Sequence, residues 1–235
     1  MTLLHFLTFA CLVSALLAQT CPDTDITFLF DQSENALTAS TNDPINSLTR
    51  FDILREQVAN ALRNSRILNT PRNIDIRVGG YGYSSSANVT SVIPKDSSPD
   101  AAIGSLVNGL FLIKNAGSWT YRGLQGITSG PTYANNILIV ISSQGSAWST
   151  NRRLLAQQEA QRVRSLGWNI TAIALQGKNP IYFEELTAVN NNQPPIVIND
   201  TTNTDDPKSY RLLRPELDTI INSLCNVCPS APPLC

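Results

Sequence analysis

The fold is decided by the stretch Asp25–Asn35, which reads Asp-Ile-Thr-Phe-Leu-Phe-Asp-Gln-Ser-Glu-Asn. Its apolar first half predicts a short buried strand, after which the chain turns toward a helix. Asp31 and Ser33 therefore stand at the carboxyl end of a strand, which is where open α/β sheets bind their ligands. Both side chains offer the hard oxygen atoms that magnesium and manganese prefer. The stretch thus predicts a ligand-binding edge as well as a strand.

Patterns of strand and helix alternate along the rest of the chain. The run Ile137–Ile141 contains only Ile, Leu and Val, as is typical of a strand buried on both faces. Further strands are predicted at 26–30, 72–83, 87–93, 168–175 and 196–198, and helices at 48–62, 99–112, 120–129, 150–166, 182–189 and 210–224. This order predicts an α/β fold, a doubly wound and mostly parallel central sheet of Rossmann-like type with helices on both faces. The hairpin of the second and third strands supplies one antiparallel edge strand.

The first 18 residues are rich in Leu and Phe and contain no Asp, Glu, Lys or Arg. They predict a secretory signal peptide cleaved after Ala18. A short membrane anchor is the alternative, although the apolar run is shorter than the ~20 residues of a spanning helix. We expect a secreted, extracellular chain with a signal peptide (1–18), one domain (21–225), a Cys- and Pro-rich tail (226–235) and no membrane insertion after cleavage.

Five cysteines are present, and Cys11 falls in the signal segment. The remaining four predict disulfides, because an even number of cysteines in a secreted chain favours pairing, and four cysteines allow three pairings. We favour Cys21–Cys225, which would join the two ends of the domain, with Cys228–Cys235 closing the tail. A redox role for Cys225 and Cys228 is a weaker alternative, because they follow a helical pattern and would lie at its negative pole.

The charge balance and the glycosylation motifs fit an extracellular protein. The formal net charge at pH 7 is −1, which argues against nucleic acid as a partner. Three Asn-x-Ser/Thr sequons predict N-linked glycosylation, at Asn88, Asn169 and Asn199.

From Asp25 to Leu224 the chain resembles the von Willebrand factor type A (VWA) domain family, both in motif and in the order of its elements. In that family, three loops at one edge of the sheet form a metal-ion-dependent adhesion site (MIDAS), and the first loop carries Asp-x-Ser-x-Ser. Here this loop reads Asp-Gln-Ser-Glu-Asn over 31–35, so Asn35 replaces the last serine. The resemblance implies a Rossmann-like fold and a role in adhesion or matrix assembly through this edge.

The second and third loops of the resemblance are also altered. Ser118, in Gly-Ser-Trp-Thr, aligns with the ligating threonine, and Ser143 stands where the family has an aspartate. Only Asp31 then contributes a formal charge, so the electrostatic attraction for a dication is weaker. The side chain of Asn35 is longer than that of serine, so its oxygen is poorly placed for the strict geometry of magnesium. We expect Mg²⁺ or Mn²⁺ to bind at low affinity or not at all. The residues at the metal positions are Asp31, Ser33, Asn35, Ser118 and Ser143.

Bulky aromatic side chains surround the same loops, at Trp119, Tyr121 and Trp148. Trp and Tyr are preferred anchors of protein interfaces, so these residues predict a rim that binds a partner. Packing against the end of the sheet is the alternative. Arg122 adds positive charge beside the second loop, which would further disfavour a bound cation.

Four arginines fall on the predicted helix 150–166, at Arg152, Arg153, Arg162 and Arg164. They could form a basic patch. Spacing puts the first two on adjacent faces of the first helical turn, so a solvated face is the favoured interpretation.

The leading hypothesis is a secreted, non-enzymatic module that binds an extracellular protein or matrix ligand with weak or no metal dependence. A metal-dependent adhesion domain is the alternative. A secreted hydrolase is remote, because Ser-His-Asp and Cys-His catalysis need an imidazole. The only histidine, His5, lies in the predicted signal peptide.

Overall fold

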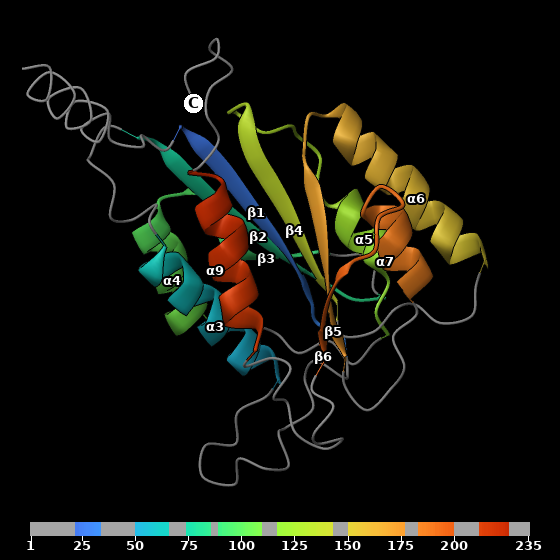
Figure 1. Cartoon of the computed structure of the whole chain (residues 1–235), viewed down its shortest axis with the longest axis horizontal. Coiled ribbons are helices and arrows are strands. Elements are labelled where there is room, and N and C mark those ends of the chain that lie inside the picture. The colour runs from blue at the N-terminus through green and yellow to red at the C-terminus, as the bar shows by residue number, and fades with distance from the viewer. Residues whose placement is uncertain are drawn as a thin grey trace, which may run out of the picture.

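The computed structural model describes residues 22–33, 50–65, 74–85, 89–109, 117–142, 150–176, 183–199 and 212–225. These ranges contain six strands and six helices (Figure 1). The strands are β1 (Thr24–Asp31), β2 (Ile76–Tyr83), β3 (Thr90–Ser97), β4 (Asn135–Ser142), β5 (Ile170–Gln176) and β6 (Ile196–Asn199). The helices are α3 (Arg50–Asn64), α4 (Pro99–Asn108), α5 (Thr120–Gln125), α6 (Thr150–Ser165), α7 (Phe183–Val189) and α9 (Leu213–Ser223).

The strands form one sheet in the order β3-β2-β1-β4-β5-β6. Every neighbouring pair is parallel except β2 and β3, which are antiparallel. The predicted fold class is therefore confirmed, including its antiparallel edge strand. Because the strand order reverses at β1, the carboxyl edge of β1 and β4 is the switch point at which doubly wound sheets bind ligands.

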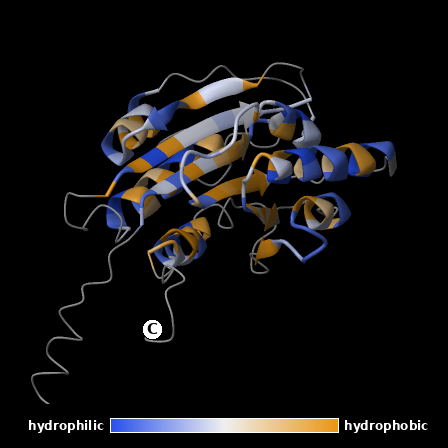
Figure 2. Ribbon diagram, turned by 90° about the horizontal axis from the view of Figure 1, so that it is seen from above, coloured by the Kyte–Doolittle hydropathy of each residue, from blue (hydrophilic) through white to orange (hydrophobic). Residues whose placement is uncertain are grey.

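Alternating side chains of β1 pack into two separate hydrophobic cores, one on each face of the sheet. Ile26, Phe28 and Phe30 pack with α3, α4 and α9, whereas Leu29 packs with α5, α6 and α7 on the other face. Figure 1 shows these two helix layers on opposite sides of the sheet, and in Figure 2 apolar colour runs along the strands between them. The ring of Phe30 meets that of Phe51 edge to face at 6.2 Å, which fixes α3 against β1.

Some element boundaries differ from those predicted. The edge strand β3 continues through Pro94 to Ser97, where the prediction ended at residue 93. An edge strand accepts proline because one side of it needs no ladder hydrogen bond. The pairing with β2 shifts register between Val78 and Tyr81, and Asp96 adopts a positive φ of 61°. The bulged strand therefore keeps pairing beyond the proline.

Helix α4 begins as its sequence indicates and ends early. The hydroxyl of Ser98 accepts a hydrogen bond from the Ala101 N–H, and Pro99 occupies the first turn, where its missing N–H is tolerated. The helix ends at Asn108, before Gly109. Within the described ranges, no helix combines the length and the apolar character that crossing a membrane requires.

Candidate functional site

The first loop of the site is held in place by its own side chains. Asp31 and Ser33 are both 1% exposed, and the Ser33 N–H donates to Asp31 Oδ1 at 2.9 Å. Between them, the Gln32 side chain lies flat on Gly82, and the Thr90 hydroxyl donates to Gln32 Oε1 at 2.7 Å. Gly82 allows this contact because it has no side chain. The loop thus carries a carboxylate and a hydroxyl, both buried at the carboxyl edge.

The hub of the buried edge is Tyr83, the residue of β2 that pairs in register with Asp31. It is 1% exposed, and its hydroxyl lies 3.4 Å from the carbonyl oxygen of Ile141. Burial raises the pKa of this phenol far above its ordinary value, and the negative charges of Asp31 and Glu185 raise it further. The phenol is therefore neutral, and its hydroxyl donates a hydrogen bond to β4.

Three hydroxyls at this edge are buried without a hydrogen-bond partner among the described residues. They are Ser33 Oγ, Ser118 Oγ and Thr120 Oγ1, in residues that are 1%, 4% and 0% exposed. A buried hydroxyl that makes no hydrogen bond costs about 1–3 kcal/mol. Two of these three hydroxyls, those of Ser33 and Ser118, stand at positions where the VWA resemblance places hydroxyl ligands.

A second carboxylate lies near the first, on α7. Glu185 is 2% exposed and close enough to Tyr83 to affect its pKa. The sequence patterns did not single out this residue. A signal was nevertheless present, since Glu185 precedes Leu186 and stands four residues before Val189, on the side of α7 that is buried.

The donor set fits a cation in part. Asp31, Ser33 and Ser118 supply oxygen atoms, while Asn35 and Ser143 lie outside the described residues. Within the described part of the chain, no three His, Cys, Asp or Glu side chains come together as metal ligands do. One carboxylate oxygen of Asp31 also accepts the hydrogen bond from the Ser33 N–H in its own loop. The edge therefore offers hydroxyls suited to a metal but little charge to hold one.

Beside this buried edge, two stacked aromatic rings lie between two arginines. Trp119 stacks on Tyr121 with ring centroids 5.8 Å apart and planes inclined by 16°. The guanidinium carbon of Arg152 lies 4.6 Å from the Trp119 ring, and that of Arg122 lies 5.1 Å from the Tyr121 ring. Trp119 is half-buried, whereas Tyr121 is 7% exposed and packs in the core. Trp148 lies outside the described residues.

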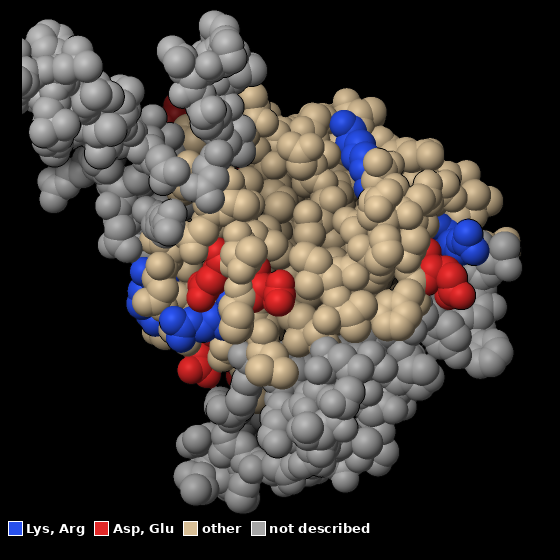
Figure 3. Space-filling view, viewed as in Figure 1, with Lys and Arg blue, Asp and Glu red and all other residues tan. Residues whose placement is uncertain are grey.

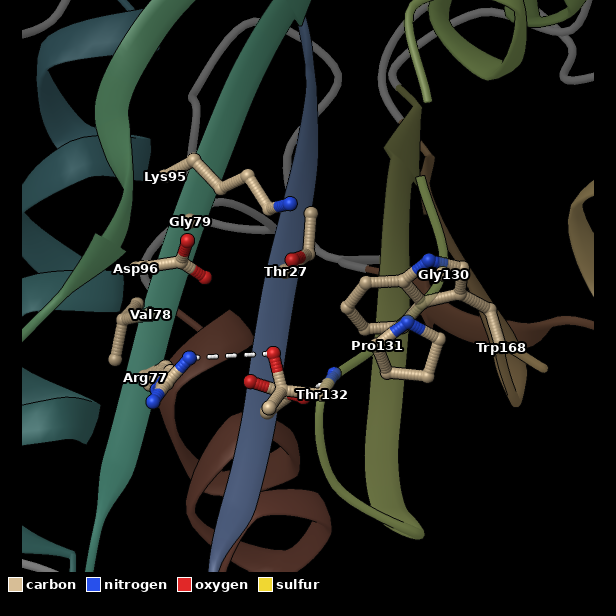
Figure 4. Close-up of a pocket in the computed structure, with 11 residues that line it drawn as sticks. Thr27, Arg77, Val78, Gly79, Lys95, Asp96, Gly130, Pro131, Thr132 and Trp168 are labelled. Atoms are coloured by element: carbon tan, nitrogen blue, oxygen red, sulfur yellow. Dashed lines mark hydrogen bonds between the residues drawn. The ribbon is translucent and has the colours of Figure 1, made fainter. Parts of the chain in front are cut away.

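A pocket at the opposite, amino half of the sheet is lined by both polar and apolar side chains (Figure 4). Three of its four charged side chains already bond within the domain. Asp25 accepts from the backbone N–H of Thr132, Arg77 Nη1 lies 3.2 Å from Thr132 Oγ1, and Lys95 Nζ lies 2.7 Å from Ser129 Oγ. These bonds fasten the segment before β4 to β1, β2 and β3, and they occupy every charged side chain of the pocket except Asp96.

Comparison with known proteins gives matches of structure only. No family model and no curated protein sequence match the chain. Proximal thread matrix protein 1 (PTMP1) from the mussel byssus is 15% identical, with a TM-score of 0.61, over 88% of this chain and 49% of that chain. The PilB minor pilin from Streptococcus sanguinis is 11% identical, with a TM-score of 0.62, over 88% of this chain and 63% of that chain.

The same superpositions identify the fold. Another PTMP1 structure, 16% identical with a TM-score of 0.57 over 87% of this chain and 46% of that chain, has a zinc-occupied MIDAS motif. The chain has the VWA fold. The pilus adhesin SpaC from Lactobacillus rhamnosus GG shares it at 15% identity, with a TM-score of 0.55, over 87% of this chain and 31% of that chain. The chain thus spans about half the length of PTMP1 or less than a third of SpaC.

Within the VWA fold, the described residues bring two of the three predicted loops to one edge. Several predictions stay untested because they concern residues outside the described ranges. These are the signal peptide, Cys21, the C-terminal tail and Asn88. The second sequon asparagine, Asn169, donates from Nδ2 to the carbonyl oxygen of Asn136 at 3.2 Å. The third, Asn199, ends β6. Glycosylation remains a prediction.

Proposed function

We propose that the chain is a secreted, non-enzymatic module for adhesion or matrix assembly, which binds a protein or matrix ligand through the carboxyl edge of its sheet. One observation carries the proposal: in a VWA fold, two loops in the order of the family's motifs meet at the topological switch point, around Asp31, Ser33 and Ser118. The structural neighbours support it, because they are a byssal matrix protein, a minor pilin and a pilus adhesin.

The part of this edge that a partner would contact is the half-buried Trp119, supported from below by Tyr121. Trp buries a large area and loses little conformational entropy, so it is a frequent hot spot of interfaces. We infer that Trp119 anchors the partner, with Trp148 completing the rim. Metal would then contribute little to affinity.

A binding assay on variants tests this proposal. Multimers of the mature protein are applied to a panel of immobilised extracellular-matrix proteins and to cell surfaces. We expect Trp119→Ala to lower the binding found by at least tenfold, the usual loss at a hot spot. Val107→Ala is the matched control, because Val107 is 55% exposed on α4, in the opposite helix layer. Equal binding by both variants would exclude the carboxyl edge as the binding face.

Metal-dependent adhesion is the second candidate, and the unsatisfied hydroxyls of Ser33 and Ser118 favour it. A cation there would be held by Asp31, Ser33 and Ser118, with Asn35 and Ser143 as the further predicted positions. A bound ion would supply a positive charge for a carboxylate of the partner. Asp31, Ser33 and Ser118 themselves would fix the loop and exclude water from the edge.

Calorimetric titration separates the two candidates. Mg²⁺ and Mn²⁺ are titrated into the mature protein and into Asp31→Asn, which keeps an oxygen that can accept from the Ser33 N–H and removes the charge. Saturable binding that the variant loses would establish the metal site. No heat at millimolar ion, together with adhesion that survives a chelator, supports the metal-independent candidate.

We also propose the disulfide Cys21–Cys225. Asn135 supports it, because its Nδ2 donates both to Thr24 Oγ1 at 2.7 Å and to the Leu224 carbonyl oxygen at 3.0 Å. Positions 24 and 224 are thereby held together, next to the two cysteines. In the chain-entropy model, a loop of this length stabilises the fold by about 5 kcal/mol. Peptide mapping without reduction tests the pairing, and a Cys21–Cys228 or Cys21–Cys235 peptide would overturn it.

A further inference from the structure

The rim of the carboxyl edge contains a continuous run of four side chains, Arg152, Trp119, Tyr121 and Arg122, which we name the arginine–aromatic stack. Each neighbouring pair is in ring contact, with separations of 4.6, 5.8 and 5.1 Å along the run. A guanidinium over an aromatic face gains from the cation–π attraction and is held flat. The stack therefore fixes two cations beside the buried edge.

The arginines of the α5–α6 layer differ in what they bond. Arg162 donates to the carbonyl oxygens of Leu124 and Ile127 at 2.8 and 3.0 Å and pairs with Glu159 at 2.7 Å. Its role is structural, because it satisfies the last carbonyls of α5 and ties that helix to α6. Arg164 likewise donates to a backbone carbonyl of α7.

Arg152 bonds to nothing comparable. Within the ranges that the structure describes, no hydrogen bond and no ion pair of its guanidinium is found, and its contact is the Trp119 ring. Arg122 makes a single hydrogen bond, to Gln125 Oε1 at 3.1 Å, and no ion pair among the same residues. The fold thus holds a half-exposed guanidinium in a fixed orientation, with its in-plane N–H donors unused.

We propose that the arginine–aromatic stack recognises a carboxylate of the protein partner directly, through the N–H donors of Arg152. A guanidinium that lies flat on a ring directs its donors outward along its own plane, and two of them match the two oxygens of a carboxylate. Leu155 follows Arg152 by three positions on α6, so it lies beside it, and it is 37% exposed. The partner segment therefore carries Asp or Glu next to an apolar residue. This inference rests on the proposed function, since it places the contact on the same face.

The charges of the surface favour an acidic protein segment over a sulfated polysaccharide. A polyanion is bound by an extended basic track, whereas the chain has a net charge of −1. On the face that Figure 3 shows, Lys and Arg form separate small patches, some of them beside Asp and Glu, and no continuous basic track. Exposed Leu155, one helical turn from Arg152, also suits a peptide better than a sugar.

A peptide pair tests the proposal on the mature protein. The probe is acetyl-Gly-Asp-Leu-Gly-amide, its control has Asn in place of Asp, and a chelator is present throughout. The readout is the indole N–H signal of Trp119 in ¹H–¹⁵N spectra. We expect the Asp peptide to shift this signal saturably and the Asn peptide to bind about tenfold more weakly, because hydrogen bonds between charged groups are worth roughly twice those between neutral ones.

Three variants locate the effect. Arg152→Gln should lose the preference for Asp over Asn, and Arg152→Lys should retain part of it, since lysine keeps the charge but not the planar donors. Arg153→Gln is the matched control, because Arg153 is exposed on the same helical turn and contacts no aromatic ring among the residues that the structure describes. All three should keep the melting temperature of the parent, because neither arginine makes a hydrogen bond within the described residues.

Several results would overturn the proposal. Equal binding of the two peptides, or an equal loss in Arg152→Gln and Arg153→Gln, would leave no specific carboxylate contact. A preference for Asp that requires added Mg²⁺ would assign the carboxylate to a metal, and tighter binding of a heparin oligosaccharide at the same signal would assign the stack to polysaccharide. In the adhesion assay, loss with Trp119→Ala but not with Arg152→Gln would refute this inference alone. No loss in either variant would refute the proposed function as well.

Discussion

Replacing Gly82 by alanine should displace the first loop of the binding edge. A β-carbon at this position would lie 2.1 Å from Gln32 Cδ and 2.2 Å from its Oε1, so the carboxamide must move. Gln32 is 1% exposed and accepts the hydrogen bond of Thr90, which breaks when it leaves. Overpacking costs about 1–3 kcal/mol and a lost hydrogen bond about 1 kcal/mol. We expect Gly82→Ala to lower the free energy of unfolding by about 2–3 kcal/mol.

A double-mutant cycle isolates the cause. Gln32→Ala alone should cost about 1–2 kcal/mol, through the lost hydrogen bond and a small cavity. Adding Gly82→Ala to it should cost almost nothing more, because the new methyl group enters the space that the carboxamide leaves. The coupling free energy is then about 2 kcal/mol, within the range for residues in contact. Urea unfolding measures all four proteins, and additivity within about 0.5 kcal/mol would refute the reasoning.

Gly104 provides the matched control for the same substitution. It lies inside α4, and nothing is found within 4 Å of the β-carbon that alanine would add. Because glycine destabilises a helix interior relative to alanine, we expect Gly104→Ala to raise the free energy of unfolding by about 0.5–1 kcal/mol. A loss of stability in this variant would show that α4 is not packed as described.

Two further predictions concern groups outside the binding edge. Arg162→Gln removes the guanidinium that bonds two carbonyls at the end of α5. It should lower the free energy of unfolding by about 1–3 kcal/mol in thermal unfolding, whereas Arg153→Gln should lower it by nearly nothing. Equal losses in the two variants would contradict the structural role of Arg162. The hydroxyl of Tyr133 donates to Asp75 and lowers the pKa of that carboxyl below 3.8. A depressed folded pKa gives stability that is present above the unfolded value and is lost as pH falls through the folded value. Tyr133→Phe should therefore raise the Asp75 pKa toward 3.8 and weaken this acid dependence, and an unchanged NMR titration would contradict the assignment.

Much of the fold could be predicted from the sequence because its signals are local. The run Ile137–Ile141 lies within β4, as its unbroken apolar pattern indicates, and Ser98 with Pro99 sets the start of α4. The sequence pattern ended the third strand at residue 93, before Pro94. The strand β3 instead passes through Pro94, because it is an edge strand whose bulge restores pairing with β2.

The candidate site was less predictable, since its contacts join segments that lie far apart in the sequence. Asp31 and Ser33 could be placed at the strand end by pattern alone. The stacking of Arg152 on Trp119 could not, because periodicity places a residue on a face of its own helix and not against a ring of another segment. The burial of Glu185 was missed for a related reason: a glutamate in a first helical turn is usually solvated, and only the packing of α7 shows that it points inward.

The clamp formed by Asn135 has a mechanical consequence. It holds Thr24 and Leu224 together at the amino edge of the sheet, and the proposed binding loops lie at the other end of the strands. Force applied to the chain before Thr24 and to the chain after Leu224 would therefore act on neighbouring points of the domain. Tension between these two points would pass through the Asn135 clamp and not through the rim. A load from a partner would enter at the rim, run along the strands and leave the domain at this clamp.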